Sequence, residues 1–177
     1  MSTLPASVRE SIEVAAANRG LGTSIRSAAP LGGGCIHQGT RLTFESDASA
    51  FVKWSGSVPP GMFEAEAAGL AALRDASHDA DAGLVIPEVL GSGSTSEGSW
   101  LMLEYVAPGR ESPESDEALG GGLALLHDVA AAGDFGWSED NWIGSLAQSN
   151  SSSDSWSGFW IKERIEPQLE RARRAGA

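Results

Sequence analysis

The stretch that decides the fold begins with a short apolar strand, Ala50-Phe-Val-Lys-Trp54, and continues after a Pro-Gly turn into a helical pattern that opens with Met62-Phe-Glu-Ala-Glu66. Alternate side chains of a strand share one face, so Lys53 lies on the face of Phe51 and opposite Val52. A lysine in a buried strand is costly unless its ammonium group meets an anion. On an edge strand the same lysine prevents aggregation. The pattern therefore predicts either an anionic partner for Lys53 or an edge position.

The helix that follows offers two acids as that partner. At about 100° per residue, Phe63, Ala67 and Leu70 share one apolar arc, and Leu73 lies at its margin. Glu66 falls inside this arc and Glu64 falls outside it. An acid on a buried helix face requires a cation. We therefore expect Glu66 to pair with Lys53, and Glu64 to be solvated.

Upstream of Lys53, the pattern predicts a helix over residues 2–19 and three consecutive antiparallel strands over residues 24–31, 40–46 and 50–54. The first two strands are separated by Gly32-Gly33-Gly34-Cys35-Ile36. Glycines let a backbone approach a ligand closely and point successive N–H groups at an anion. A plain hairpin loop accounts for an isolated glycine triplet equally well. The position of Lys53 on the third strand, within reach of the same loop, favours a phosphate cover.

Downstream, we expect a helix over residues 62–77, a strand over 84–90, a flexible connection over 91–98 and a strand over 99–106. The last strand ends in Glu104-Tyr105-Val106, just before a Pro-Gly linker. The Glu104 carbonyl and the Val106 amide at such an end are suited to hydrogen-bond an adenine. The series of glycine loop, strand lysine, helix acid and strand-to-linker junction is the order found in kinases.

The fold class predicted is therefore α+β, a protein-kinase-like N-lobe with a five-stranded antiparallel sheet and one αC-type helix, followed by the first helices of a helical C-lobe. Residues 1–106 form the N-lobe, 107–116 the linker and 117–177 the start of the C-lobe. We expect helices over residues 117–132 and 156–174, and a solvated loop over 150–155.

The composition restricts the partners and the compartment. A formal charge of −12 and a pI near 4.5 argue against nucleic acid and anionic membranes, since a phosphate surface would meet like charge. Solubility is the simplest reading of that acidity. The single cysteine, Cys35, excludes an internal disulfide and fits a reducing compartment. No apolar run approaches the length of a membrane span and no leader pattern is visible, so we expect a cytoplasmic protein.

At this point a resemblance can be named. Together with Gly32–Ile36, residues 51–53, 62–66 and 103–106 resemble the N-lobe of the fructosamine (ketosamine) kinase family, which is related to the aminoglycoside and choline kinases. The run into the C-lobe is similar as well and covers most of the remaining chain: Leu126, His127, Phe135, Gly136, Trp137, residues 140–144, Gln148, Asn150, Trp156, Phe159, Arg164 and Gln168.

The resemblance implies ATP and Mg²⁺ as cofactors, and a ketosamine small molecule or a glycated protein as the partner phosphorylated at the sugar 3-hydroxyl. The implied ATP site comprises Gly32, Gly33, Gly34, Cys35, Ile36, Lys53, Glu66, Glu104, Tyr105 and Val106. The family's catalytic loop and metal-binding Asp do not occur before Ala177. We therefore expect no catalytic residue in this chain, magnesium ligands outside it, and no activity of the chain alone.

Two short motifs imitate the missing parts, and two other functions compete. His127-Asp128 and Asp134-Phe-Gly136 look like a catalytic loop and a magnesium motif, but they lie too close together for a loop and two strands between them. An aminoglycoside- or choline-type kinase shares every N-lobe element, and residues 140–144 argue against it. A non-catalytic nucleotide-binding or dimerisation module is the alternative of another class.

Cys35 has two interpretations. A lone thiol is usually a small buried hydrophobe. Inside a glycine loop, however, backbone N–H groups favour a thiolate. The family's glycine-loop cysteine is associated with redox sensitivity. Because any disulfide must then join two chains, we expect oxidation to give a homodimer through Cys35.

Overall fold

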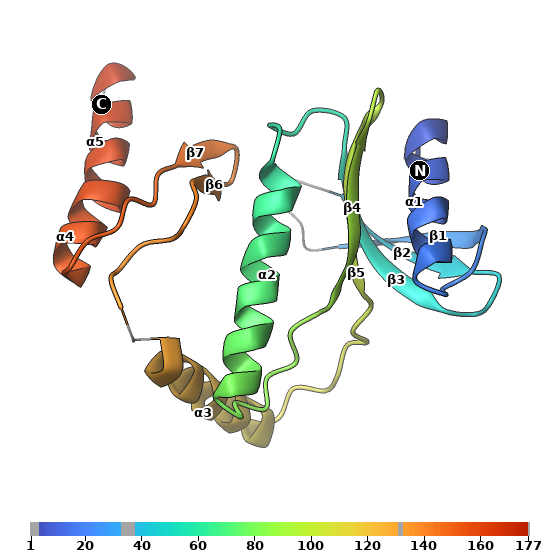
Figure 1. The fold of residues 1–177 in the computed structure, drawn as a ribbon, viewed down its shortest axis with the longest axis horizontal. Coiled ribbons are helices and arrows are strands. Elements are labelled where there is room, and N and C mark those ends of the chain that lie inside the picture. Colours follow the sequence, from blue (N-terminus) through green and yellow to red (C-terminus); the bar gives the residue numbers. More distant parts are fainter. Residues whose placement is uncertain (1–3, 33–37, 131–132, 177) are drawn as a thin grey trace.

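The computed structural model describes residues 4–32, 38–130 and 133–176 (Figure 1). Its first part consists of α1 (Ala6–Asn18), β1 (Ile25–Leu31), β2 (Gln38–Phe44), β3 (Ser49–Ser55), α2 (Met62–Asp79), β4 (Val89–Thr95) and β5 (Gly98–Glu104). Its second part consists of α3 (Pro113–Ala130), β6 (Asn141–Ile143), β7 (Leu146–Gln148), α4 (Trp156–Trp160), the π-helical turn η1 (Ile161–Ile165) and α5 (Glu166–Arg174).

A five-stranded antiparallel sheet in the order β1-β2-β3-β5-β4 organises the first part. Helix α1 covers one face of the sheet and α2 lies on the other (Figure 1). The predicted α+β fold class is therefore confirmed. Strand β3 lies between β2 and β5, so Lys53 is not on an edge strand, and the aggregation-preventing interpretation of this lysine is wrong.

The core between α1 and the sheet contains the largest buried side chains. Val8, Ile12 and Ala16 of α1 pack on one buried cluster of the sheet, formed by Ile25, Leu42, Phe44, Ala50, Val52, Trp100 and Met102. The Trp100 indole N–H donates to Ser11 Oγ at 3.1 Å, which satisfies its one polar group. This packing assigns the even-numbered β3 residues Ala50 and Val52 to the α1 face and leaves Phe51 and Lys53 for the α2 face.

Strand β4 begins later than the sequence pattern indicates. Residues 84–88 carry no regular structure, and the glycine- and serine-rich stretch predicted as a flexible connection is strand up to Thr95. The cause is Trp100 on the neighbouring strand, whose side chain is 2% exposed. A Cβ at Gly93 would lie 2.9 Å from the indole ring, so only glycine lets the indole lie against β4.

A second, smaller core lies between the sheet and α2. Phe63, Leu101 and Leu103 are buried there, and partly buried side chains pack around them: Phe51, Val58, Ala67, Leu70 and Val89. Leu73, at the margin of the predicted apolar arc, is 44% exposed. The α2 members of this core end at Leu70, so the C-terminal half of α2 extends beyond it.

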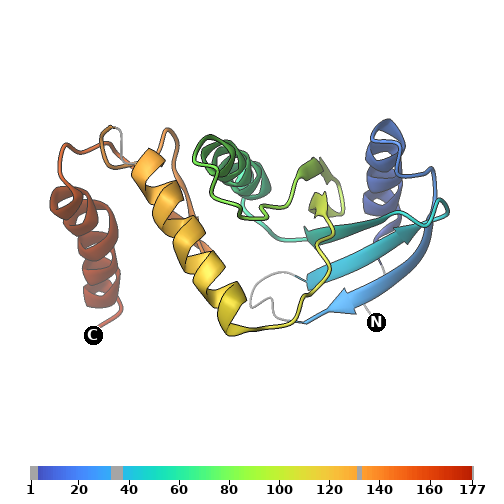
Figure 2. The same cartoon turned by 90° about the horizontal axis from the view of Figure 1, so that it is seen from below.

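The second part of the chain joins the first along α2. Helix α3 begins at Pro113, inside the expected linker, and approaches the residues after α2 closely at Gly122, where a Cβ would lie 2.5 Å from the Ala82 carbonyl oxygen. Figure 2 shows α3 running beside the end of α2. At the other end of α2, the Trp142 ring lies 3.5 Å from a Cβ built at Gly61.

The β6–β7 hairpin was not predicted. Residues 151–155 are mostly exposed and contain no helix or strand, as expected for a solvated loop, but residue 150, the first of the expected range, is buried. Asn150 is 2% exposed; its backbone N–H donates to Asp140 Oδ1 at 3.0 Å and its side chain donates to the Glu139 carbonyl at 2.9 Å. Arg164 donates to Asn150 Oδ1 at 2.5 Å. These bonds connect the hairpin to the last helical segment. That segment contains the π-helical turn η1 and covers the expected residues 156–174. Among the described helices, none has the length and apolarity needed to cross a bilayer.

Candidate functional site

An ion pair joins the sheet to α2. Lys53 Nζ donates to Glu66 Oε1 at 2.5 Å, and the two side chains are 30% and 31% exposed. Glu64, the other acid considered, is exposed. A pair with this much water access contributes little to stability. Its consequence is geometric, since it holds one ammonium group on the α2 face of the sheet.

Both partners are positioned by local structure. Strand alternation aims Lys53 at the α2 face, and pairing with Gly39 and Leu101 fixes its register. Helix α2 starts after Gly61, whose positive φ of 82° suits glycine, and its buried Phe63 docks the first turn on the sheet. Glu66 follows about one turn later and therefore faces β3.

The residue before the glycine segment lies in the same row of the sheet as Lys53. Leu31 ends β1 and pairs with Gly39, which in turn pairs with Lys53, so the three lie in one row across the sheet. Gly32 follows Leu31 directly; it is exposed, and a Cβ there would meet no atom within 4 Å.

Gly33, Gly34, Cys35 and Ile36 lie outside the described residues. Their role in binding phosphate and the redox role of Cys35 stay predictions.

The predicted adenine-binding run lies at the end of β5. Glu104 is the last strand residue, and its backbone N–H donates to the Glu88 carbonyl at 2.8 Å. The Glu88 N–H donates instead to the side chain of Glu104, at 3.2 Å from Oε2. The Tyr105 ring stacks under the Arg41 guanidinium, 4.5 Å from the ring centroid. Val106 is 44% exposed.

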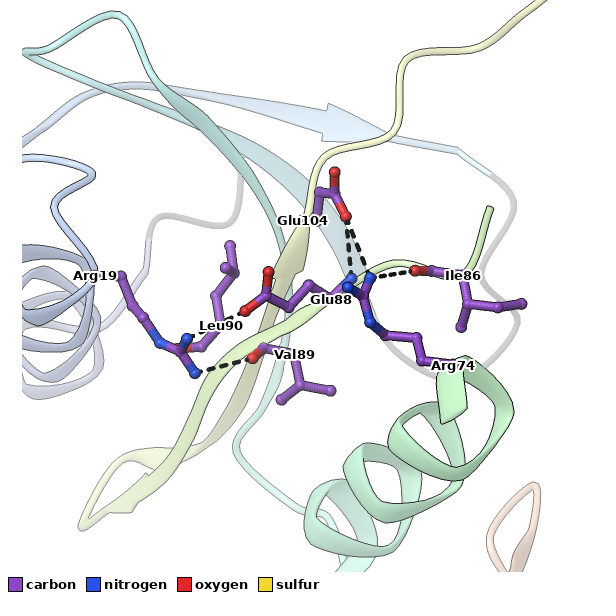
Figure 3. Close-up of polar contacts among 7 residues, drawn as sticks. All are labelled: Arg19, Arg74, Ile86, Glu88, Val89, Leu90 and Glu104. Atoms are coloured by element: carbon purple, nitrogen blue, oxygen red, sulfur yellow. Dashed lines mark hydrogen bonds and ion pairs between the residues drawn. The ribbon is translucent and has the colours of Figure 1, made fainter. Parts of the chain in front are cut away.

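Two arginines hold the entry to β4, which lies beside the end of β5, from opposite sides (Figure 3). Arg74 of α2 donates to the Ile86 carbonyl at 2.8 Å and lies 3.9 Å from Glu104 Oε2. Arg19, just after α1, pairs with Glu88 at 3.2 Å and donates to the carbonyls of the first two β4 residues, at 3.2 and 3.0 Å. The entry to β4 and the end of β5 are therefore connected to both helices.

Sequence reasoning missed these arginines. Arg74 lies about two helical turns after Glu66, a spacing that places the two side chains on neighbouring faces of α2. Arg41 shares a strand face with Gly39, and its register partner is Phe51. The contacts of Arg19 depend on how α1 packs against β4, which no local pattern reports.

The two motifs rejected as catalytic, at residues 127–128 and 134–136, lie in separate local structures. His127 lies in the last turn of α3 and Asp134 accepts a hydrogen bond from Ser152 Oγ at 2.9 Å. Within residues 4–32, 38–130 and 133–176, no cluster of three or more His, Cys, Asp or Glu side chains is arranged to hold a metal ion.

Comparison with known proteins identifies the relatives of this chain. The fructosamine kinase family profile matches residues 8–177. A probable ketoamine kinase of Synechocystis sp. is 37% identical over 142 residues, which cover 80% of this chain and 46% of that protein. A chloroplastic protein-ribulosamine 3-kinase of Oryza sativa subsp. japonica is 37% identical over 153 residues, covering 85% of this chain and 43% of the relative.

The fold has a solved counterpart as well. A crystal structure from Haemophilus somnus 129PT, assigned as a fructosamine-3-kinase, superposes with a TM-score of 0.77 at 26% identity and covers 93% of this chain and 54% of that one. The chain thus spans about half the length of the proteins it matches. Because the family profile covers nearly all of it, the chain belongs to the fructosamine kinase family.

Proposed function

We propose that this chain is the ATP-binding part of a kinase that phosphorylates ketosamines. The observation that carries the proposal is the 2.5 Å contact between Lys53 Nζ and Glu66 Oε1. It holds a cation on the face of the sheet from whose edge the glycine segment departs. Nucleotide phosphates require such a fixed positive charge, because phosphoryl transfer depends on positioning and charge neutralisation.

The other site residues take complementary roles. The glycine segment from Gly32 onward covers the β- and γ-phosphates, and Lys53 neutralises them while Glu66 fixes its position. The Glu104 carbonyl and the Val106 amide hydrogen-bond the adenine. Support for this last role comes from the Glu104 side chain. It accepts the hydrogen bond of the Glu88 N–H in place of the Glu104 carbonyl.

The reaction and its substrates follow from the relatives, whose names refer to ketoamines and ribulosamines. We propose that the full-length enzyme phosphorylates the sugar 3-hydroxyl of a ketosamine, free or on a glycated protein, with ATP and Mg²⁺. Residues 1–106 are the ATP-binding lobe, 107–116 the linker and 117–177 the start of the helical lobe. We propose that the magnesium ligands and the catalytic base lie outside residues 1–177, since the chain spans about half the length of its relatives.

The test is a comparison of two lysine variants. ATP binding by the wild-type chain, Lys53→Met and Lys162→Met is measured by ligand-observed NMR up to millimolar nucleotide. Lys162 is exposed on the last helix and serves as the control for loss of one positive charge. We expect Lys53→Met to raise the Kd for ATP about tenfold or more, since a charge-assisted contact to phosphate is lost. Lys162→Met keeps wild-type affinity. Equal affinities of the two variants would remove Lys53 from the site.

A further inference from the structure

We propose that a cavity between the β6–β7 hairpin and the last helical segment binds the protonated amine of a ketosamine, an inference that rests on the function proposed above. The cavity has a volume of about 250 Å³. Pockets for drug-sized ligands occupy about 300–1,000 Å³, so this one suits a smaller molecule, such as a single sugar unit. Six polar side chains contribute to its lining: Asp140, Gln148, Ser149, Glu163, Gln168 and Arg171.

Glu163 places a buried carboxylate in this lining. The residue is 5% exposed, whereas Asp140 and Gln168 are exposed. The Ser149 hydroxyl donates to Glu163 Oε2. Among the residues that the structure describes, none donates to Oε1 and no cation pairs with the carboxylate. A buried carboxylate is costly unless it meets a cation or further donors, so Glu163 is suited to a ligand that supplies positive charge.

The arginines nearest to Glu163 in the structure serve the hairpin instead. Arg164 donates to the Ser149 carbonyl at 2.7 Å, and Arg171 donates to the Ala147 carbonyl at 2.6 Å. Both bonds attach the helical segment to the backbone of the hairpin. They hold the two walls of the cavity together and direct the guanidinium groups at carbonyl oxygens rather than at the Glu163 carboxylate.

The remaining polar groups of the lining are suited to hydroxyls. Gln148 Nε2 donates to Asn141 Oδ1 at 2.9 Å, and Asp140 Oδ1 accepts from the Asn150 N–H at 3.0 Å. Within the described part of the chain, Gln148 Oε1, Asp140 Oδ2 and the Gln168 amide have no partner. A sugar hydroxyl donates to such oxygens and accepts from an amide N–H. The cavity therefore offers a carboxylate for an amine and several acceptors for a polyol.

Two features of the chain favour a binding role over a purely structural one. Glu163 lies in the π-helical turn η1, and single π-helical turns within helices are rare and frequent at functional sites. Asp140, Gln148 and Gln168 are among the residues by which the sequence resembles its family, and they are far apart in the chain. The structure brings all three to the lining of one cavity.

The hairpin relates this cavity to the proposed phosphate site. In Figure 1 it lies between α2 and the last helical segment. Its Trp142 ring lies 3.5 Å from a Cβ built at Gly61, which precedes the first turn of α2, and Glu66 follows on the same helix. A ketosamine bound in the cavity would therefore contact the element that adjoins the helix holding Lys53.

The experiment titrates the 177-residue chain with 1-amino-1-deoxyfructose and with fructose, which has a hydroxyl in place of the amine, by ligand-observed NMR. Glu163→Gln removes the charge and keeps an oxygen for the Ser149 hydroxyl. Glu170→Gln is the control, since Glu170 is exposed on α5 and pairs with Arg174 at 3.1 Å. The wild type should bind the amino sugar about tenfold more tightly than fructose, because the contact to the carboxylate is charge-assisted. Glu163→Gln should remove this preference, and Glu170→Gln should keep it.

A second measurement uses the wild-type chain alone. The side-chain amide signals of Gln148 and Gln168 should shift when the amino sugar is added. Unshifted amides, equal affinities of the wild type for the two sugars, or an unchanged preference in Glu163→Gln overturn the amine site.

The ATP titration separates this inference from the function on which it rests. ATP binding that depends on Lys53, without binding of the amino sugar, overturns the amine site alone. Amino-sugar binding that depends on Glu163, without ATP binding, supports the amine site and overturns the ATP-binding role.

Discussion

Arg74 Nη1 lies 3.9 Å from Glu104 Oε2 and donates to the Ile86 carbonyl at 2.8 Å, so α2 is attached to the end of β5 (Figure 3). The same helix is attached to β3 through Glu66 and Lys53. One helix therefore orients both the cation proposed for phosphate and the backbone proposed for adenine.

Arg74→Gln removes the second attachment. The ion pair is half exposed, so we expect a stability loss of about 0.5 kcal/mol and, because β5 loses a support, about a threefold weaker ATP affinity. Urea unfolding and the NMR titration measure the two effects. Arg9→Gln is the control, since Arg9 pairs with Glu13 at 3.1 Å on α1, away from the site. An ATP affinity equal to wild type in both variants would show that Arg74 does not position β5.

Glu66→Gln tests the ion pair at the centre of the site, with Glu64→Gln as the matched control two residues earlier. Without its carboxylate, the half-buried Lys53 ammonium loses its counter-charge. We expect Glu66→Gln to lower the free energy of unfolding by about 0.5–1 kcal/mol. The exposed Glu64 contributes only through its place in the first turn of α2, about 0.3 kcal/mol, so its variant should lose less stability than Glu66→Gln. Equal urea midpoints for the two variants would contradict the assignment.

Gly122→Ala and Gly121→Ala should change stability in opposite directions. A Cβ at Gly122 would lie 2.5 Å from the Ala82 carbonyl oxygen and 2.6 Å from Leu84 Cδ2, whereas a Cβ at Gly121 meets nothing within 4 Å. The first substitution pushes α3 away from the residues after α2 at a cost of about 1–3 kcal/mol. The second gains up to about 1 kcal/mol of helix propensity. Thermal unfolding of both variants decides the matter, and a stabilised Gly122→Ala would refute the close contact.

Ser7→Ala should raise the pKa of Glu97. Hydrogen bonds from the Ser7 hydroxyl and then from its backbone N–H hold the pKa of the Glu97 carboxyl below its ordinary value, and they connect α1 to the β4–β5 turn. The sign follows from linkage: a lowered folded pKa contributes stability above the unfolded pKa, and this is lost as pH falls through the folded value. A carboxyl titration by NMR should place Glu97 nearer its ordinary pKa in the variant. Identical titrations would exclude the Ser7 hydroxyl as the main cause.

Periodicity was sufficient for the elements that carry the site. Alternation in β3 and the helical arc of α2 indicate which face each side chain takes, and together they select Glu66 over Glu64 as the acid that the structure places beside Lys53. Both patterns are local. Strand β3 lies inside the sheet and the first half of α2 packs against it, so burial enforces both patterns.

The errors arise where distant residues decide the structure. Glycines and serines form most of β4 because the Trp100 side chain covers them. The local sequence of β4 does not reveal a tryptophan on the neighbouring strand. Asn150 is held in the interior by Arg164, a residue of another element, which donates a hydrogen bond to the Asn150 side chain. The β6–β7 hairpin has three-residue strands, too short for any alternation to be read.

The attachment of the second part at both ends of α2 has a thermodynamic consequence. Gly122 brings α3 to one end of this helix and Trp142 brings the β6–β7 hairpin to the other, while the side chains between hold Lys53 and Glu104. If a ligand of the second part tilts α2, the nucleotide affinity must change. By reciprocity, nucleotide must then change the affinity for that ligand by the same factor. In that case the helix would couple two binding equilibria that share no contact.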